Sequence, residues 1–137
     1  METIFEKIIA GNIPTNKVYE DEQTFAFLDG EPVNPGHTLV ISRKPYKDIY
    51  EIPQADFLAV MKTVHKLAPI IKQAVEADGI NLHNNNDPAA GQRVPHYHIH
   101  IIPRFENDGF QHWQGSEDYH EGEHGKEIAR SITDFLK

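Results

Sequence analysis

The stretch VPHYHIHIIPR, residues 94–104, is the segment of the sequence that says most about the fold. His96, His98 and His100 stand at every second position, with aromatic or aliphatic residues between them. Alternate side chains of a strand share a face, so the imidazoles should line one face while the residues between them pack on the core. We therefore expect a strand that presents three histidines to a cleft.

Further β-rich pieces, separated by turn-forming residues, surround this stretch. The pattern predicts five strands, at 17–20, 24–28, 37–42, 80–84 and 94–102, the last of them ended by Pro103. The first two flank a short polar turn, as in a hairpin. The last two should be antiparallel neighbours.

One long helix is inserted among the strands. Apolar residues recur at helical spacing over 53–78, where Pro53 suits the first turn and Gly79 suits a stop. Pro69 lies inside this pattern and should kink or locally open the helix, because proline lacks the N–H of the helical ladder.

Two shorter helices are predicted near the ends of the chain. Thr3 and Glu6 have the spacing of a capping box, and Gly11 can end the amphipathic turn that follows. A second amphipathic helix covers 126–137. Strands that are mostly neighbours along the chain, with one long helix inserted, predict an α+β fold with a largely antiparallel sheet.

Length and composition limit the class of protein. At 137 residues the chain has the length of one ordinary domain, and we expect 1–137 to be a single unit. A formal charge of −8 argues against broad binding to nucleic acid or to an anionic membrane. No apolar run approaches the roughly 20 residues of a membrane span. Because the chain has no cysteine, disulfides and cysteine-based zinc sites are excluded, and we expect a cytoplasmic location.

A metal site is one interpretation of the histidine run. The outer two histidines of a regular strand lie ~13 Å apart, whereas each Zn–N bond spans only ~2 Å. One ion could bind two of them easily and all three only with distortion, and a third ligand could come from His37, His83 or His112. A solvated polar face is the other plain interpretation, and three histidines in register disfavour it.

Residues 120–124, HEGEH, match the H-E-x-x-H pattern of zinc hydrolases. That pattern requires a helix to bring both histidines to one side of the ion. Gly122 lies inside this segment, Gly125 follows it, and no apolar periodicity buries it. We expect a polar, acidic loop here rather than a metal site.

Nucleophilic catalysis at phosphorus is the third interpretation. A neutral imidazole can attack a phosphoryl centre, and its neighbours can neutralise the phosphate oxygens and assist the leaving group. The preceding loop, AAGQRVP, fits such a site. Gly91 allows backbone amides to approach an anion, Gln92 offers a donor, and Arg93 offers a cation.

HYHIHII resembles the signature of the histidine triad superfamily of nucleotide hydrolases and transferases. Residues 4–41 resemble the amino-terminal half of this family, and AGQ at 90–92 stands where its phosphate loop would be. The resemblance covers about 4–104 and leaves the polar loop and last helix, 105–137, unmatched.

The resemblance implies a role for each matching residue. His98 would be the nucleophile, His96 and His100 would orient it and contact the phosphate, and Gln92 would lie beside the leaving group. Asp29 would hold the ribose hydroxyls, since a carboxylate can accept two donors. The remaining nucleotide-binding residues would be Ile4, Phe5, Ile8, Phe27 and Leu39 around the base, His37 in the hydrogen-bond network behind the triad, and Asn85, Gly91, Arg93 and Val94 near the phosphate.

The family also implies a homodimer in which one sheet, five strands from each copy, continues across the interface. Arg93 departs from the Ser or Thr that many members carry, so a cation replaces a hydroxyl contact. The third histidine, in place of glutamine, points away from the uridylyltransferase branch and towards hydrolysis.

We therefore expect a nucleotide hydrolase acting on the α-phosphate of purine nucleoside phosphoramidates or dinucleoside polyphosphates. The reaction would proceed through a nucleotidyl-histidine and would require no metal or other cofactor. Two alternatives stay open: a nucleotide-binding sensor with negligible turnover, and a metalloprotein that uses the HxH pair.

Overall fold

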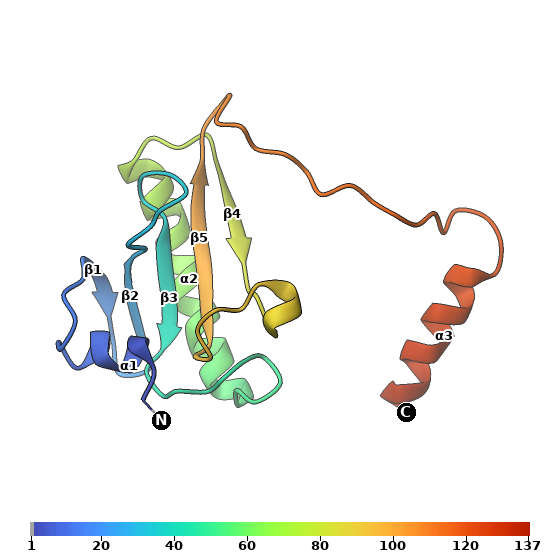
Figure 1. Ribbon diagram of the computed structural model, residues 1–137, viewed down its shortest axis with the longest axis horizontal. Helices are drawn as coiled ribbons and strands as arrows, with labels where there is room; N and C mark the ends of the chain where they lie inside the picture. The colour runs from blue at the N-terminus through green and yellow to red at the C-terminus, as the bar shows by residue number, and fades with distance from the viewer. Residues whose placement is uncertain (1) are drawn as a thin grey trace.

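The computed structural model describes residues 2–137, and its centre is one antiparallel sheet (Figure 1). The strand order is β1-β2-β3-β5-β4, and every neighbouring pair is antiparallel. The strands are β1 (Lys17–Glu20), β2 (Thr24–Leu28), β3 (Thr38–Ser42), β4 (Gly79–His83) and β5 (His98–Arg104). The helices are α1 (Ile4–Ile9), α2 (Gln54–Ala74) and α3 (His124–Leu136), with a short 3₁₀ turn, η1 (Pro88–Ala90). The predicted α+β class and five-stranded sheet are confirmed.

Each face of the sheet carries its own apolar cluster. On one face α2 packs against alternate residues of the central strands, among them Val40, Ile99 and Ile101. On the other face α1 packs Phe5 and Ile8 against the opposite set of β2 and β3 side chains. Because strand residues alternate between the two faces, the sheet carries one apolar cluster on each face. The short helix α1 covers only part of its own face.

The first helix begins as its sequence indicates. Thr3 accepts from the N–H of Glu6, and the Glu6 carboxylate accepts from the N–H of Thr3, so the capping box is formed in full. Gly11 follows with a φ of +82°, which glycine adopts without strain.

The long helix differs from its prediction at both ends. Pro53 is the N-cap rather than part of the first turn, and the helix ends at Ala74. Glu76, with a φ of +55°, turns the chain in the left-handed region, so Gly79 starts β4 instead of ending the helix. The helix runs without a break through Pro69, where exposure leaves the unpaired carbonyl open to water.

The histidine strand is shorter at its start and longer at its end than predicted. It begins at His98, so His96 lies in the bend before it, and it continues through Pro103 to Arg104. At Pro103 the strand has passed its last pairing with β3 and pairs only with β4. A residue without an N–H is tolerated where a strand has one partner. The predicted antiparallel pairing of β4 with β5 is confirmed.

After β5 the chain stays bonded to the body through Glu106 and Asp108, and it leaves the body beyond them. Figure 1 shows an extended segment that passes outward on the β4 side and ends in α3, which stands clear of the sheet. No helix of the described residues is both long and apolar enough to cross a membrane.

Candidate active site

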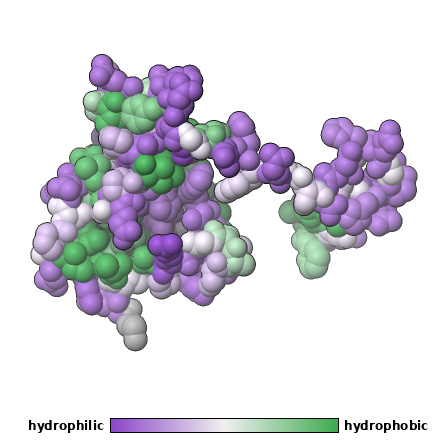
Figure 2. Space-filling model, turned by 45° about the horizontal axis from the view of Figure 1, so that its top comes forward, coloured by the Kyte–Doolittle hydropathy of each residue, from purple (hydrophilic) through white to green (hydrophobic). Residues whose placement is uncertain are grey.

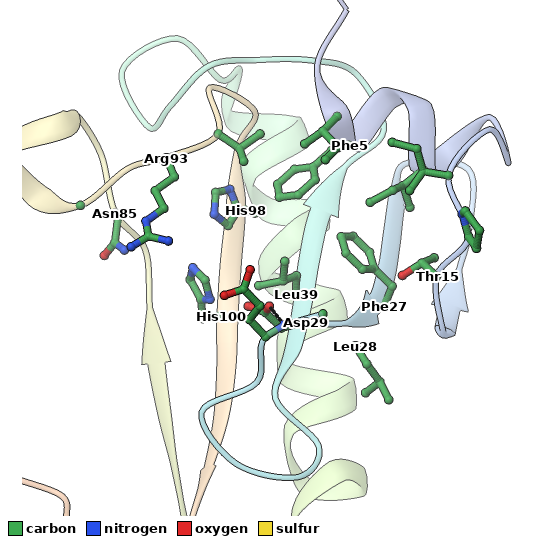
Figure 3. Close-up of a pocket in the computed structure, with 18 residues that line it drawn as sticks. Phe5, Thr15, Phe27, Leu28, Asp29, Leu39, Asn85, Arg93, His98 and His100 are labelled. Carbon is green, nitrogen blue, oxygen red and sulfur yellow. Dashed lines mark hydrogen bonds between the residues drawn. The ribbon is translucent and has the colours of Figure 1, made fainter.

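A cavity of about 560 Å³ opens on the sheet face that α1 partly covers. One end is apolar and is lined by Ile4, Phe5, Ile8, Phe27, Leu39 and Val94. The other end is polar and is lined by Asp29, Asn85, Gly91, Arg93, His98 and His100. Figure 3 shows His98 and His100 side by side on β5, with Asn85 and Arg93 across from them. The structure thus brings together most of the residues that the sequence selected.

His98 has one ring nitrogen engaged and one free. Its Nδ1 lies 2.6 Å from the carbonyl oxygen of His96, and a carbonyl only accepts, so Nδ1 carries the ring proton. Nε2 therefore keeps its lone pair. Burial lowers the pKa of His98 below the usual 6.5, which keeps the ring neutral near pH 7. The edge of Phe5 packs on this ring at a centroid distance of 5.0 Å.

His100 has the opposite tautomer. The N–H of Val33 donates to Nδ1 of His37 at 3.0 Å, so Nε2 of His37 carries the proton. That Nε2–H donates to Nδ1 of His100 at 3.0 Å, which leaves the Nε2–H of His100 as a donor. Burial, together with His98 and His37 nearby, lowers the pKa of His100 to about 4. Adjacent side chains on β5 thus offer a lone pair and an N–H.

His96 does not lie where the strand pattern placed it. Its ring is fully buried, and its Nε2–H donates to the carbonyl oxygen of Ser42. Its Nδ1 accepts from the hydroxyl of Thr3 at 2.8 Å. Both ring nitrogens are therefore used inside the protein, and His96 holds α1 and its own carbonyl in place instead of lining the cavity. The bend before β5 turns this side chain out of the shared row.

Gln92 is also outside the cavity lining. Its side-chain oxygen accepts from the N–H of Asp87 at 2.9 Å, and its amide nitrogen donates to the carbonyls of Lys47 and Val94. The amide thus closes the loop from Asp87 to Gly91 on itself. Because the backbone engages both ends of the amide, one of these bonds would have to open before Gln92 could contact a leaving group.

Asp29 sits at the end of β2 beside His100 (Figure 3). Its Oδ1 accepts from the N–H of Glu31 at 2.8 Å, and its Oδ2 lies 3.5 Å from Nε2 of His37. His37 precedes β3 rather than starting it, and it contributes behind the cavity through His100. This matches the network expected behind the triad.

Asp29, His37 and His100 place potential metal-ligand atoms within 4.8 Å of one another. Their hydrogen bonds argue against a metal there. His37 would have to give up the N–H of Val33 before Nε2 could offer a lone pair, because one neutral ring has only one unprotonated nitrogen. Within the described residues, this group therefore fits a hydrogen-bonded relay better than a metal site.

Sequence reasoning missed part of the lining. These residues lie at the end of β2 or follow α1 or β2 within a few positions: Ile13, Pro14, Thr15, Leu28, Gly30 and Glu31. Their signal was proximity along the chain, since GNIPT continues from α1 and DGE contains Asp29.

The HIT domain family model matches residues 10–107 of this chain. The chain belongs to the HIT family. The matched region contains β5, the loop before it and the strands that carry the cavity.

Relatives cover almost the whole of this HIT protein. The curated protein hit of Bacillus subtilis is 45% identical over 97% of this chain and 93% of its own length. A crystal structure of a Bacillus subtilis HIT family member matches with a TM-score of 0.89 at 43% identity, covering 98% of this chain and 96% of that one. A Streptococcus mutans crystal structure matches at 0.90 and 37% identity over 99% of this chain and 86% of that one.

Two curated relatives have names that state an activity. An adenylylsulfatase of Arabidopsis thaliana is 40% identical over 78% of this HIT protein and 54% of its own length. An adenosine 5'-monophosphoramidase of Candida albicans is 35% identical over 74% of this chain and 69% of its own length.

Proposed function

We propose that this HIT protein hydrolyses purine nucleotides at the α-phosphorus, with phosphoramidates or dinucleoside polyphosphates as substrates. The observation that carries the proposal is the free Nε2 lone pair of His98 at the polar end of a cavity that is otherwise apolar. The names of the adenylylsulfatase and phosphoramidase relatives support the same class of reaction.

The apolar end suits a purine base, and the polar end suits its phosphate. Phe5, Phe27 and Leu39 offer flat and aliphatic surface for a ring. Asp29 lines the polar end beside His100, and its carboxylate can accept from ribose hydroxyls there. Arg93, across from the two histidines, supplies a cation for the phosphate oxygens.

In the first step Nε2 of His98 attacks the α-phosphorus. A P–N bond forms, the bond to the leaving group breaks, and the leaving group departs with the electron pair and takes up a proton. The ring becomes cationic, and its Nδ1–H bond to the carbonyl of His96 then stabilises that charge. In this proposal the Nε2–H of His100 donates to a phosphate oxygen.

In the second step water attacks the phosphorus and the P–N bond breaks. The nucleoside monophosphate is released, one proton is lost, and His98 returns to its neutral tautomer. Lowered pKa values of His98 and His100 suit this cycle, because a protonated His98 has no lone pair to attack with.

The test uses wild type, His98→Ala and the tail control His120→Ala with adenosine 5'-phosphoramidate and with diadenosine tetraphosphate. Loss of the nucleophile should lower kcat by at least about 1000-fold, whereas the control should retain full turnover. Mass spectrometry after denaturing quench should find an adenylyl adduct at His98. The ratio of the two turnover rates shows whether phosphoramidates or dinucleoside polyphosphates are the preferred substrates.

A folded His98→Ala protein with wild-type turnover would refute the mechanism. Tight binding of adenosine monophosphate without hydrolysis of either substrate would favour the sensor. Loss of activity on chelation, restored by one metal, would favour the metalloprotein.

We further propose a homodimer that pairs through the free edge of β4. This edge has no partner strand in the described chain, and Leu82 on it is 48% exposed. Leu58 on the neighbouring helix α2 is exposed as well. Unpaired strand edges with apolar side chains are sites of association. Leu82→Lys should weaken the dimer in sedimentation experiments, whereas Val18→Lys on the opposite edge strand should not; equal effects would exclude this edge.

A further inference from the structure

Helix α3 carries an apolar face against which no other part of the described chain, residues 2–137, packs. Ile128, Ile132, Phe135 and Leu136 recur at helical spacing, and Phe135 is 92% exposed. No residue of α3 is buried. Figure 2 shows apolar atoms gathered on one side of the separate lobe that this helix forms.

A helix of this length needs a packing surface. α3 has 13 residues, and isolated helices shorter than about 12–15 residues are marginal in water. Most of their stability in proteins comes from burial of the amphipathic face. The described residues offer α3 no such surface, so we look for it on another molecule.

The course of the segment before α3 indicates where the other molecule would lie. Residues 111–123 are exposed throughout, so they act as a spacer rather than as part of the body. Figure 1 shows this spacer running past β4, the edge strand that has no partner on its outer side. A second copy paired along β4 would lie in the space between the sheet and α3.

Crystal structures of relatives hold the same arrangement. Residues 1–104 are about three quarters of the chain, so superposing them alone could not give a TM-score near 0.9. The Bacillus subtilis and Streptococcus mutans proteins score 0.89 and 0.90 over 98% and 99% of this chain, so the projecting arm is superposed too. A helix with no contacts would not take one position in separate crystal structures.

We propose that α3 docks through its apolar face on a second copy of this chain, the one paired along β4. Each copy gives one helix and receives one, as a two-fold axis requires. The inference rests on the proposed β4 dimer and goes beyond it, because it makes residues 111–137 an arm exchanged between copies. The net charge of −8 disfavours an anionic membrane as the alternative surface.

The experiment follows the amide hydrogen exchange of α3 in the full chain across the concentration range in which sedimentation shows dimers forming. Protection of α3 should rise together with the dimer fraction. Ile132→Ser with Phe135→Ser should abolish this protection and raise the dimer dissociation constant about tenfold or more. The matched pair Thr133→Ser with Asp134→Ser, on the polar side, should change neither.

Each other outcome overturns the proposal in a distinguishable way. Protection of α3 that does not vary with concentration would place the helix on its own body. A dimer in which α3 stays unprotected would refute the exchange and leave the β4 pairing standing. A protein that is monomeric at every concentration would refute both, without affecting the proposed hydrolysis at His98. Protection that appears only with anionic vesicles would assign the face to a membrane.

Discussion

The chain has two dense histidine clusters, and their surroundings differ at every point. In the first, at 96–100, the backbone or a neighbouring side chain determines which nitrogen of each ring carries the proton. In the second, at 120–124, the side chain of His120 is 95% exposed and its carboxylate partner Asp118 is 78% exposed. The histidines of the first cluster are therefore held in defined orientations, whereas His120 in the second is a solvated side chain.

The second cluster also fails as a zinc motif for a geometric reason. α3 begins only at His124, so HEGEH is not helical and its two histidines do not share a helix face. The glycine inside the segment has a φ of +83°, which turns the chain there. The difference between the clusters shows that buried backbone partners, rather than histidine density, create a candidate catalytic site.

Among substitutions that disturb the partners of the buried histidines, the largest loss of activity should come from His37. His37→Phe removes the N–H that holds the tautomer of His100, so kcat should fall about 10- to 100-fold, as for other groups that orient a functional side chain. His37→Gln retains a donor and should recover part of the loss. Steady-state kinetics on the better of the two substrates measures this; a change in KM alone would contradict the relay.

A smaller effect should come from Thr3, which ties α1 to His96. Thr3→Val removes both the helix cap and the hydroxyl that donates to His96, and should lower the free energy of unfolding by about 1 kcal/mol. Thr3→Ser preserves both bonds and should match wild type in urea unfolding. If valine is tolerated equally well, the link between α1 and the buried histidine is not a stabilising one.

The effect that is smallest near neutral pH should appear in the dependence of stability on pH. Burial lowers the pKa values of His98 and His100 in the folded state, so the unfolded chain binds more protons below pH 6.5. Stability should be level above about pH 7 and decline from pH 6.5 towards pH 4. His100→Asn should flatten this decline in thermal unfolding, whereas the exposed pair His120→Ala and His124→Ala should leave it unchanged. An equal response of both variants would show that burial does not govern the titration.

Local sequence patterns predicted those features well that depend on a single segment of the chain. The capping box at Thr3 and Glu6, the two-residue alternation around Ile99, and the apolar spacing of α2 depend on short-range geometry, and all three appear in the structure. The resemblance to the histidine triad superfamily added the association of Asp29 and Phe27 with the histidine strand, which spacing alone does not show.

Only the tertiary structure decided what each of those residues touches. His96 donates to the carbonyl of Ser42, Gln92 donates to the carbonyl of Lys47, and His37 donates to His100. Each of these bonds joins segments that are far apart in sequence. The sequence by itself therefore determined the α+β fold, the two faces of the sheet and the set of candidate groups. The tautomer of His100 depends on a hydrogen bond from His37, 63 residues away, and that of His98 depends on the bend that brings the His96 carbonyl to its ring. No local pattern of residues encodes either contact.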